Sequence, residues 1–204
     1  MTIQASARWV GSLCVIAAIM IVMSQGLHLA LGLTMGAQSA DSVLHTVKYS
    51  LALLAMFALL LALTGLYLRQ AVAAGNLGLI GYIVASLGTV LVAGDWWFEA
   101  FIAPGIAAVA PQVMTGAVTS SMVVGAVATF GLFAVGWTIF GIASFRANIY
   151  PRPAVGLLVL GGAVGILALS TPYQVPLALA VGWIGYSLIR SEPAVMLTPA
   201  ATPA

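Results

Sequence analysis

The sequence predicts an all-α, polytopic integral membrane protein with six transmembrane helices and both termini in the cytoplasm. Three observations lead to this fold class. First, the 204 residues are 63% hydrophobic and only 5% charged, whereas about a quarter of the residues in soluble domains are charged. Second, the uncharged apolar stretches are long enough to cross a bilayer repeatedly. Third, the basic residues alternate along the chain with the segments that carry most of the acidic ones.

The basic residues predict the orientation of the helices. Five of the six are arginines at the limits of the apolar stretches: Arg8, Arg69, Arg146, Arg152 and Arg190. The sixth, Lys48, lies in an intervening segment. Cytoplasmic loops of membrane proteins carry the excess of Lys and Arg. We therefore expect the arginine-bearing segments inside the cell, and loops 34–45 and 102–117 outside it.

The first three spans are expected at about 9–33, 46–68 and 77–101. The first apolar stretch has roughly 25 residues, whereas the apolar region of a signal peptide has about 7–15, so we interpret it as a retained helix. An inner turn at 70–76 contains Gly75 and Asn76, a pair that favours turns. The third span ends in Asp95, Trp96, Trp97, Phe98 and Glu99, as expected of a helix that leaves the bilayer.

The last three spans are expected at about 118–145, 154–170 and 175–189. Pro104 and Pro111 interrupt the uncharged stretch before the fourth span. The uncharged stretch after Arg152 is too long for one crossing of about 30 Å, and the break at Thr171 and Pro172 divides it in two. A re-entrant hairpin is the alternative for this pair. Residues 1–190 form one domain in this interpretation, and 191–204 form a flexible cytoplasmic tail.

A candidate site lies where the ionisable residues of the first three spans reach the outer face. Its members are His28, His45, Lys48, Asp95 and Glu99. Two imidazoles and two carboxylates can bind a ligand, relay protons or hold a divalent metal. The simpler interpretation is solvation, with Lys48 paired to Asp95 or Glu99. No ligand spacing matches a metal motif, so we predict no tightly bound metal and a polar site that responds to pH.

Other site classes receive less support from the sequence. Cys14 is the single cysteine, which excludes an intramolecular disulfide and a CxxC site. The sequence has no recognisable catalytic motif, so the balance is against an enzyme, and no cofactor is predicted. The scattered net charge of +2 gives no basic patch for nucleic acid. The aromatic residues near the expected interfaces, including Tyr49, Trp96 and Tyr150, are interpreted as interface anchors.

Glycines in the fourth and fifth spans predict close helix contacts. Small residues let transmembrane helices approach each other. The four positions are Gly131, Gly136, Gly161 and Gly165. We expect these faces to pack within the chain, and they are also the candidate contact with a membrane partner or a second copy.

Two segments resemble small multi-pass bacterial membrane proteins of uncharacterised function. They are 63–70, with the sequence LTGLYLRQ, and 94–104, with the sequence GDWWFEAFIAP. The resemblance covers the second and third spans and implies a stand-alone polytopic protein of the bacterial inner membrane, without implying an activity.

Three function classes follow from the sequence. We favour a binding or accessory subunit that packs within the membrane and carries an outer polar pocket on spans 1–3. A small transporter or channel is the first alternative, although no ionisable residue is expected at the bilayer midplane. A membrane redox or cofactor-binding protein that uses His28 as a ligand is the second.

Overall fold

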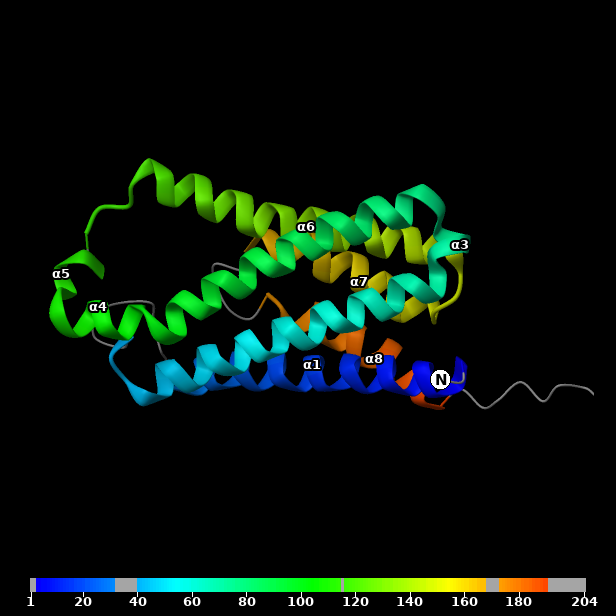
Figure 1. The fold of residues 1–204 in the computed structure, drawn as a ribbon, viewed down its shortest axis with the longest axis horizontal. Coiled ribbons are helices and arrows are strands. Elements are labelled where there is room, and N and C mark those ends of the chain that lie inside the picture. The colour runs from blue at the N-terminus through cyan, green and yellow to red at the C-terminus, as the bar shows by residue number, and fades with distance from the viewer. Residues whose placement is uncertain (1–2, 32–39, 115, 168–172, 191–204) are drawn as a thin grey trace, which may run out of the picture.

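The computed structural model describes residues 3–31, 40–114, 116–167 and 173–190, and within these ranges every regular element is a helix (Figure 1). The long helices are α1 (Ile3–Leu31), α3 (Val43–Phe101) and α6 (Ser120–Ala147). The shorter ones are α4 (Ala103–Val109), α5 (Pro111–Met114), α7 (Arg152–Ala163), the 3₁₀ helix η1 (Val164–Leu167) and α8 (Val175–Arg190).

Three helical stretches of the described chain are long and apolar enough to cross a membrane. They are Ser6–Leu29, Val43–Val109 and Ser120–Ala147. Helices α7 and α8 are also apolar but shorter, with 12 and 16 residues. At 1.5 Å per residue, α8 is about 24 Å long and α1 is about 43 Å long. The described fold is therefore all-α, and its long apolar helices fit a membrane protein.

Helix α3 consists of two antiparallel segments joined at Gly75. This residue has φ 55° and ψ −150°, a conformation that is open essentially to glycine alone. We call residues 43–74 the first segment of α3 and residues 76–101 its second segment. The expected inner turn at 70–76 is shorter in the structure, because the helix continues through 74. Gln70, which we expected in that turn, is fully buried in the helix.

Six helical segments run along the bundle in alternating directions (Figure 1). They are α1, the two segments of α3, α6, α7 with η1, and α8. The first described turn of α1, the turn at Gly75, the connection from α6 to α7 and the end of α8 lie at one end, which we call the basic end because it carries the five arginines. We call the opposite end the polar end.

The limits of α6 lie within two residues of the span expected at 118–145. Thr119 caps α6 by accepting a hydrogen bond from the Met122 N–H, and Asn148 ends the helix in the left-handed conformation. Pro104 lies in the first turn of α4, and Pro111 begins α5, so the loop expected at 102–117 contains two short helices. The expected fifth span continues beyond η1 into residues that lie outside the described chain, as does the tail at 191–204.

The core lies between helices that are distant in the sequence. Helix α3 packs against α6 and α1, α1 packs against α8, and α7 packs against both α6 and α8. Trp137, Phe133 and Phe140 of α6 are among the largest side chains that are completely buried. The Trp137 indole N–H donates to the Thr89 hydroxyl of α3 at 3.1 Å, so this bulky polar group is satisfied inside the core.

Tyr150 ties the connection between α6 and α7 to the basic end of the bundle. Its hydroxyl donates a hydrogen bond of 2.7 Å to the backbone carbonyl of Leu66. Burial raises the pKa of Tyr150, so the side chain stays neutral and remains a donor. Tyr150 is buried rather than at the surface of the bundle, which corrects its interpretation as an interface anchor.

Candidate functional site

The five predicted site residues lie at the polar end of the bundle. His28 is in the last turn of α1. His45 and Lys48 are in the first turns of α3, after the N-cap Ser42, whose hydroxyl accepts the His45 N–H. Asp95 and Glu99 are in the last turns of the second segment of α3. Since consecutive segments run in opposite directions, these turns meet at one end (Figure 1).

Lys48 is buried and bonded to a histidine. Only 3% of the residue is exposed, and its Nζ lies 3.1 Å from Nδ1 of His28. A lysine ammonium can only donate, so Nδ1 of His28 accepts and the imidazole is neutral while Lys48 is charged. The same Nζ lies 3.9 Å from the centre of the Tyr49 ring, in the position of a cation–π contact. Ser24 adds a hydrogen bond of 3.0 Å to the backbone carbonyl of Lys48.

His45 forms the second pair, with Glu99. Its Nε2 lies 3.2 Å from the carboxylate Oε2 and 3.0 Å from the backbone carbonyl oxygen of Glu99. Both oxygens are acceptors, so Nε2 carries a proton. The other ring nitrogen, Nδ1, is buried and has no hydrogen-bond partner in the described part of the chain.

The pairing differs from the expected one. We predicted that Lys48 pairs with Asp95 or Glu99, but its hydrogen bond goes to His28, and His45 takes Glu99. Lys48 follows His45 by three residues, so its side chain is turned by about 60° around the same helix. That offset directs His45 to the second segment of α3 and Lys48 to α1. Asp95 makes no hydrogen bond or ion pair with another described residue, although it interacts electrostatically with Glu99.

Aromatic rings fill the space below these pairs. The Tyr49 ring lies 4.6 Å from the His45 ring and 5.3 Å from the Trp96 ring, between centroids. Trp96 in turn lies 6.4 Å from Phe130 of α6. Tyr49 and Trp96 are 4% and 7% exposed, so they are core residues and not the interface anchors that the sequence suggested. They separate the ionisable pairs from the apolar middle of the bundle.

The polar layer extends to α8 through a residue that the sequence analysis did not assign to the site. Gln25 donates from Nε2 to Oε1 of Gln174 at 3.2 Å, and both residues are buried. The remaining amide atoms, Gln25 Oε1 and Gln174 Nε2, have no partner within the described ranges. Such atoms are suited to bind ordered water or a small polar molecule. Gln174 follows the break at Pro172, and only its polarity in an apolar stretch could have indicated this role.

The described residues contain no group of three or more His, Cys, Asp and Glu side chains that could hold a metal ion. His28 faces Lys48 and His45 faces Glu99, so the two imidazoles belong to different pairs. The arrangement can bind polar groups through its unpartnered atoms. It offers no activated nucleophile in the described chain, since Cys14 is fully buried in the core.

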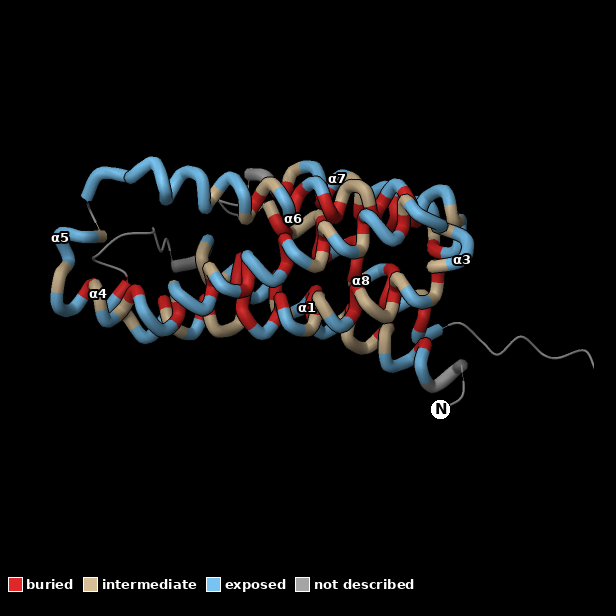
Figure 2. Tube along the Cα trace, turned by 45° about the horizontal axis from the view of Figure 1, so that its top comes forward, coloured by how far each residue is buried: buried red, intermediate tan, exposed pale blue. Residues whose placement is uncertain are grey.

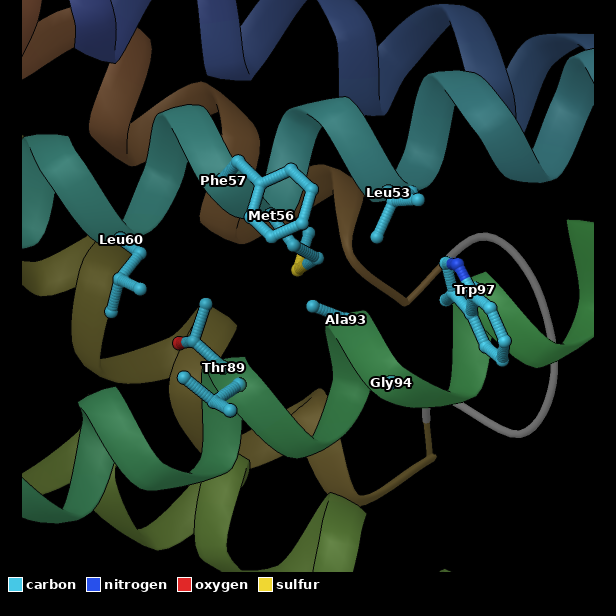
Figure 3. A pocket seen from close by; sticks show the side chains of 9 residues that line it. Leu53, Met56, Phe57, Leu60, Thr89, Ala93, Gly94 and Trp97 are labelled. Atoms are coloured by element: carbon cyan, nitrogen blue, oxygen red, sulfur yellow. The ribbon is translucent and has the colours of Figure 1, made fainter.

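An apolar groove of about 250 Å³ lies between the two segments of α3 (Figure 3). Leu53, Met56, Phe57 and Leu60 line one side, and Thr89, Val90, Ala93, Gly94 and Trp97 line the other. Thr89 is the only lining residue with a hydroxyl, which donates to the Ala85 carbonyl and accepts from Trp137. The groove therefore presents hydrocarbon to any molecule that enters it, and its chemistry suits an acyl chain.

Three of the four predicted contact glycines face other helices of the same chain. A Cβ on Gly136 would overlap the Ala85 backbone of α3, and one on Gly161 would lie 2.5 Å from the Leu177 nitrogen of α8. A Cβ on Gly165 would lie 3.2 Å from the Phe133 ring. Around Gly131, nothing lies within 4 Å of that position. Of the four, Gly131 alone keeps an open face.

Comparisons of the chain with protein-family models, with curated proteins and with solved structures find no match.

Proposed function

We propose that the chain is a six-span integral membrane protein of a bacterial inner membrane, with both termini in the cytoplasm, and that it serves as a binding or accessory subunit. In this proposal the polar end faces the extracytoplasmic side, and its two buried side-chain pairs form the functional site. Three long apolar helices support membrane insertion. The alternating segments and the five arginines at one end support the orientation.

The observation that carries the proposal is the burial of two ionisable side chains between apolar helices. Lys48 is 3% exposed and His45 is 1% exposed, and each has an ionisable partner from another segment. Ionisable groups within membrane segments are costly and usually mark a functional site. A bundle held only by packing needs neither of them, because apolar residues of similar size would fill the same space.

The position of the charges favours a binding subunit over a transporter. Transporters place substrate sites near the bilayer midplane. In the described chain, the Asp, Glu, Lys and Arg side chains lie toward the two ends, and the middle holds the Trp137–Thr89 bond and apolar side chains.

The test is purification from native membranes after cross-linking, followed by native mass spectrometry in lipid nanodiscs. We expect a stoichiometric complex with another membrane protein. The Lys48→Met variant should weaken the complex, whereas Leu54→Met, a matched change at a residue that is 51% exposed, should not. Recovery of the protein with bound lipid and without a protein partner would contradict the proposed function.

A further inference from the structure

The rest of the chain covers little of the first ten residues of α6, where eight are exposed and only Ala126 and Thr129 are half-buried. None of residues 120–129 is buried, and Phe130 is the first buried residue of this helix (Figure 2). We call 120–129 the free segment of α6. Small residues make up much of it: Ser120, Ser121, Gly125, Ala126, Ala128 and Thr129. Interfaces between transmembrane helices are enriched in such residues, because they allow close approach.

The helix register relates a carboxylate of α3 to the level of this segment. Gly81 and Gly88 of α3 contact the backbone of α6 at Phe140 and Phe133, seven residues apart on each helix. Asp95 is the next position in the same register, since residues seven apart lie on nearly the same face of a helix. Continued along α6, the register places Asp95 at the level of Ala126. The carboxylate has no hydrogen-bond or ion-pair partner in the described chain.

A second unsatisfied polar group lies at the same junction. Trp96 is 7% exposed, and its ring packs against Phe130, where α6 enters the core. Its indole N–H is buried and donates to no residue that the structure describes. The Asp95 carboxylate and the Trp96 N–H therefore have no partner in the described chain, in a region where unsatisfied polar groups are costly.

We propose that the free segment of α6 and Asp95 form the docking surface for a transmembrane helix of another protein, and that this helix carries a Lys or Arg that pairs with Asp95. The charge complementarity follows from the unpaired carboxylate, because intramembrane acids pair with bases. This inference rests on the proposed function and names the chemistry of the partner.

A second copy of the chain does not supply that base. The arginines lie at the basic end, away from Asp95. Lys48, the one Lys or Arg at the polar end, is buried and hydrogen-bonded to His28. The occupant is therefore a different protein.

The experiment uses the full-length protein in native membranes, with a photo-crosslinking amino acid at Val124, which is 67% exposed. We expect an adduct whose mapped peptide is a transmembrane segment with a Lys or Arg. Asp95→Asn should reduce the adduct at least ten-fold, whereas Asp41→Asn, the same change at an exposed site, should leave it unchanged. Exchange of charge, with Asp95→Lys and an acid in place of the mapped base, should restore it.

A second variant tests the surface without touching the carboxylate. Gly125 has nothing within 4 Å of the Cβ position, so Gly125→Leu leaves the fold intact and blocks a docking helix. Gly156→Leu on α7, which has equally open space, is the control. Adducts only with lipid or with a second copy would overturn the inference, as would an adduct that Asp95→Asn and Gly125→Leu leave unchanged. If native mass spectrometry still finds a partner in that case, the proposed function stands and only the docking surface is wrong.

Discussion

Substitution of Gly161 by alanine should separate helices α7 and α8. A Cβ at this position would lie 2.5 Å from the Leu177 nitrogen and 2.6 Å from its Cα, whereas ordinary contacts begin near 3.4 Å. Both obstructing atoms are backbone, so no rotamer change can relieve the overlap. The helices must move apart by 3.4 − 2.5 = 0.9 Å, and a gap of that size forfeits roughly a quarter to a half of the dispersion energy of each contact that it opens.

The expected loss of stability is about 1–3 kcal/mol, the usual cost of overpacking a core. Gly156→Ala on the same helix is the matched control, since its Cβ meets open space. Both variants gain the same helix propensity of about 0.5–1 kcal/mol, so the difference between them isolates the steric cost. The assay is reversible unfolding in mixed micelles, with the free energy of unfolding measured for both variants. Equal free energies for Gly161→Ala and Gly156→Ala would refute the described packing of α7 on α8.

Three further predictions follow from single contacts. Thr89→Val should lower the free energy of unfolding by about 1–3 kcal/mol, because it leaves the buried Trp137 N–H without an acceptor. Thr89→Ser keeps the hydroxyl and should retain most of the stability in the same measurement. His28→Leu should destabilise the protein more than the double variant His28→Leu/Lys48→Met does, because the single change leaves the buried Lys48 ammonium unpaired. Additive effects in the double-mutant cycle would refute the contact between His28 and Lys48. Gly75→Ala should lower the free energy of unfolding by about 1–3 kcal/mol through backbone strain at the positive φ. No atom lies within 4 Å of the Cβ position, so a steric clash does not contribute. An unchanged free energy of unfolding would count against the positive φ.

The sequence predicts the helical fold well because charges, prolines and glycines mark the ends of the helices. Pro104 lies in the first turn of α4, Pro111 begins α5, and Gly75 is the residue that leaves helical geometry. The same signals do not reveal which helices touch. Gly161 is recognisable as a contact residue, but nothing in its spacing identifies α8 as its neighbour. Which helices contact each other depends on how the surfaces of all the helices pack in the bundle.

The common level of the candidate residues was predictable from the sequence, and their pairing was not. Helix length places His28, His45 and Glu99 at one level, because each segment rises by a fixed distance per residue. The partner of Lys48 depends on how the helices are rotated about their axes, which the sequence pattern does not fix. Gln174 was missed for a similar reason, since a lone glutamine beside a proline break resembles an ordinary turn residue.

The central claim is that the chain crosses the membrane six times with its polar end outside. Single cysteines in a Cys14→Ala background test it most directly, with an impermeant maleimide applied to intact cells. Val109, the last residue of α4 at the polar end, is 84% exposed, and Val109→Cys should be labelled. Asn148→Cys, in the turn at the basic end, should react only after lysis. Labelling of Asn148→Cys but not Val109→Cys in intact cells would contradict the orientation, and labelling of both would contradict the six crossings.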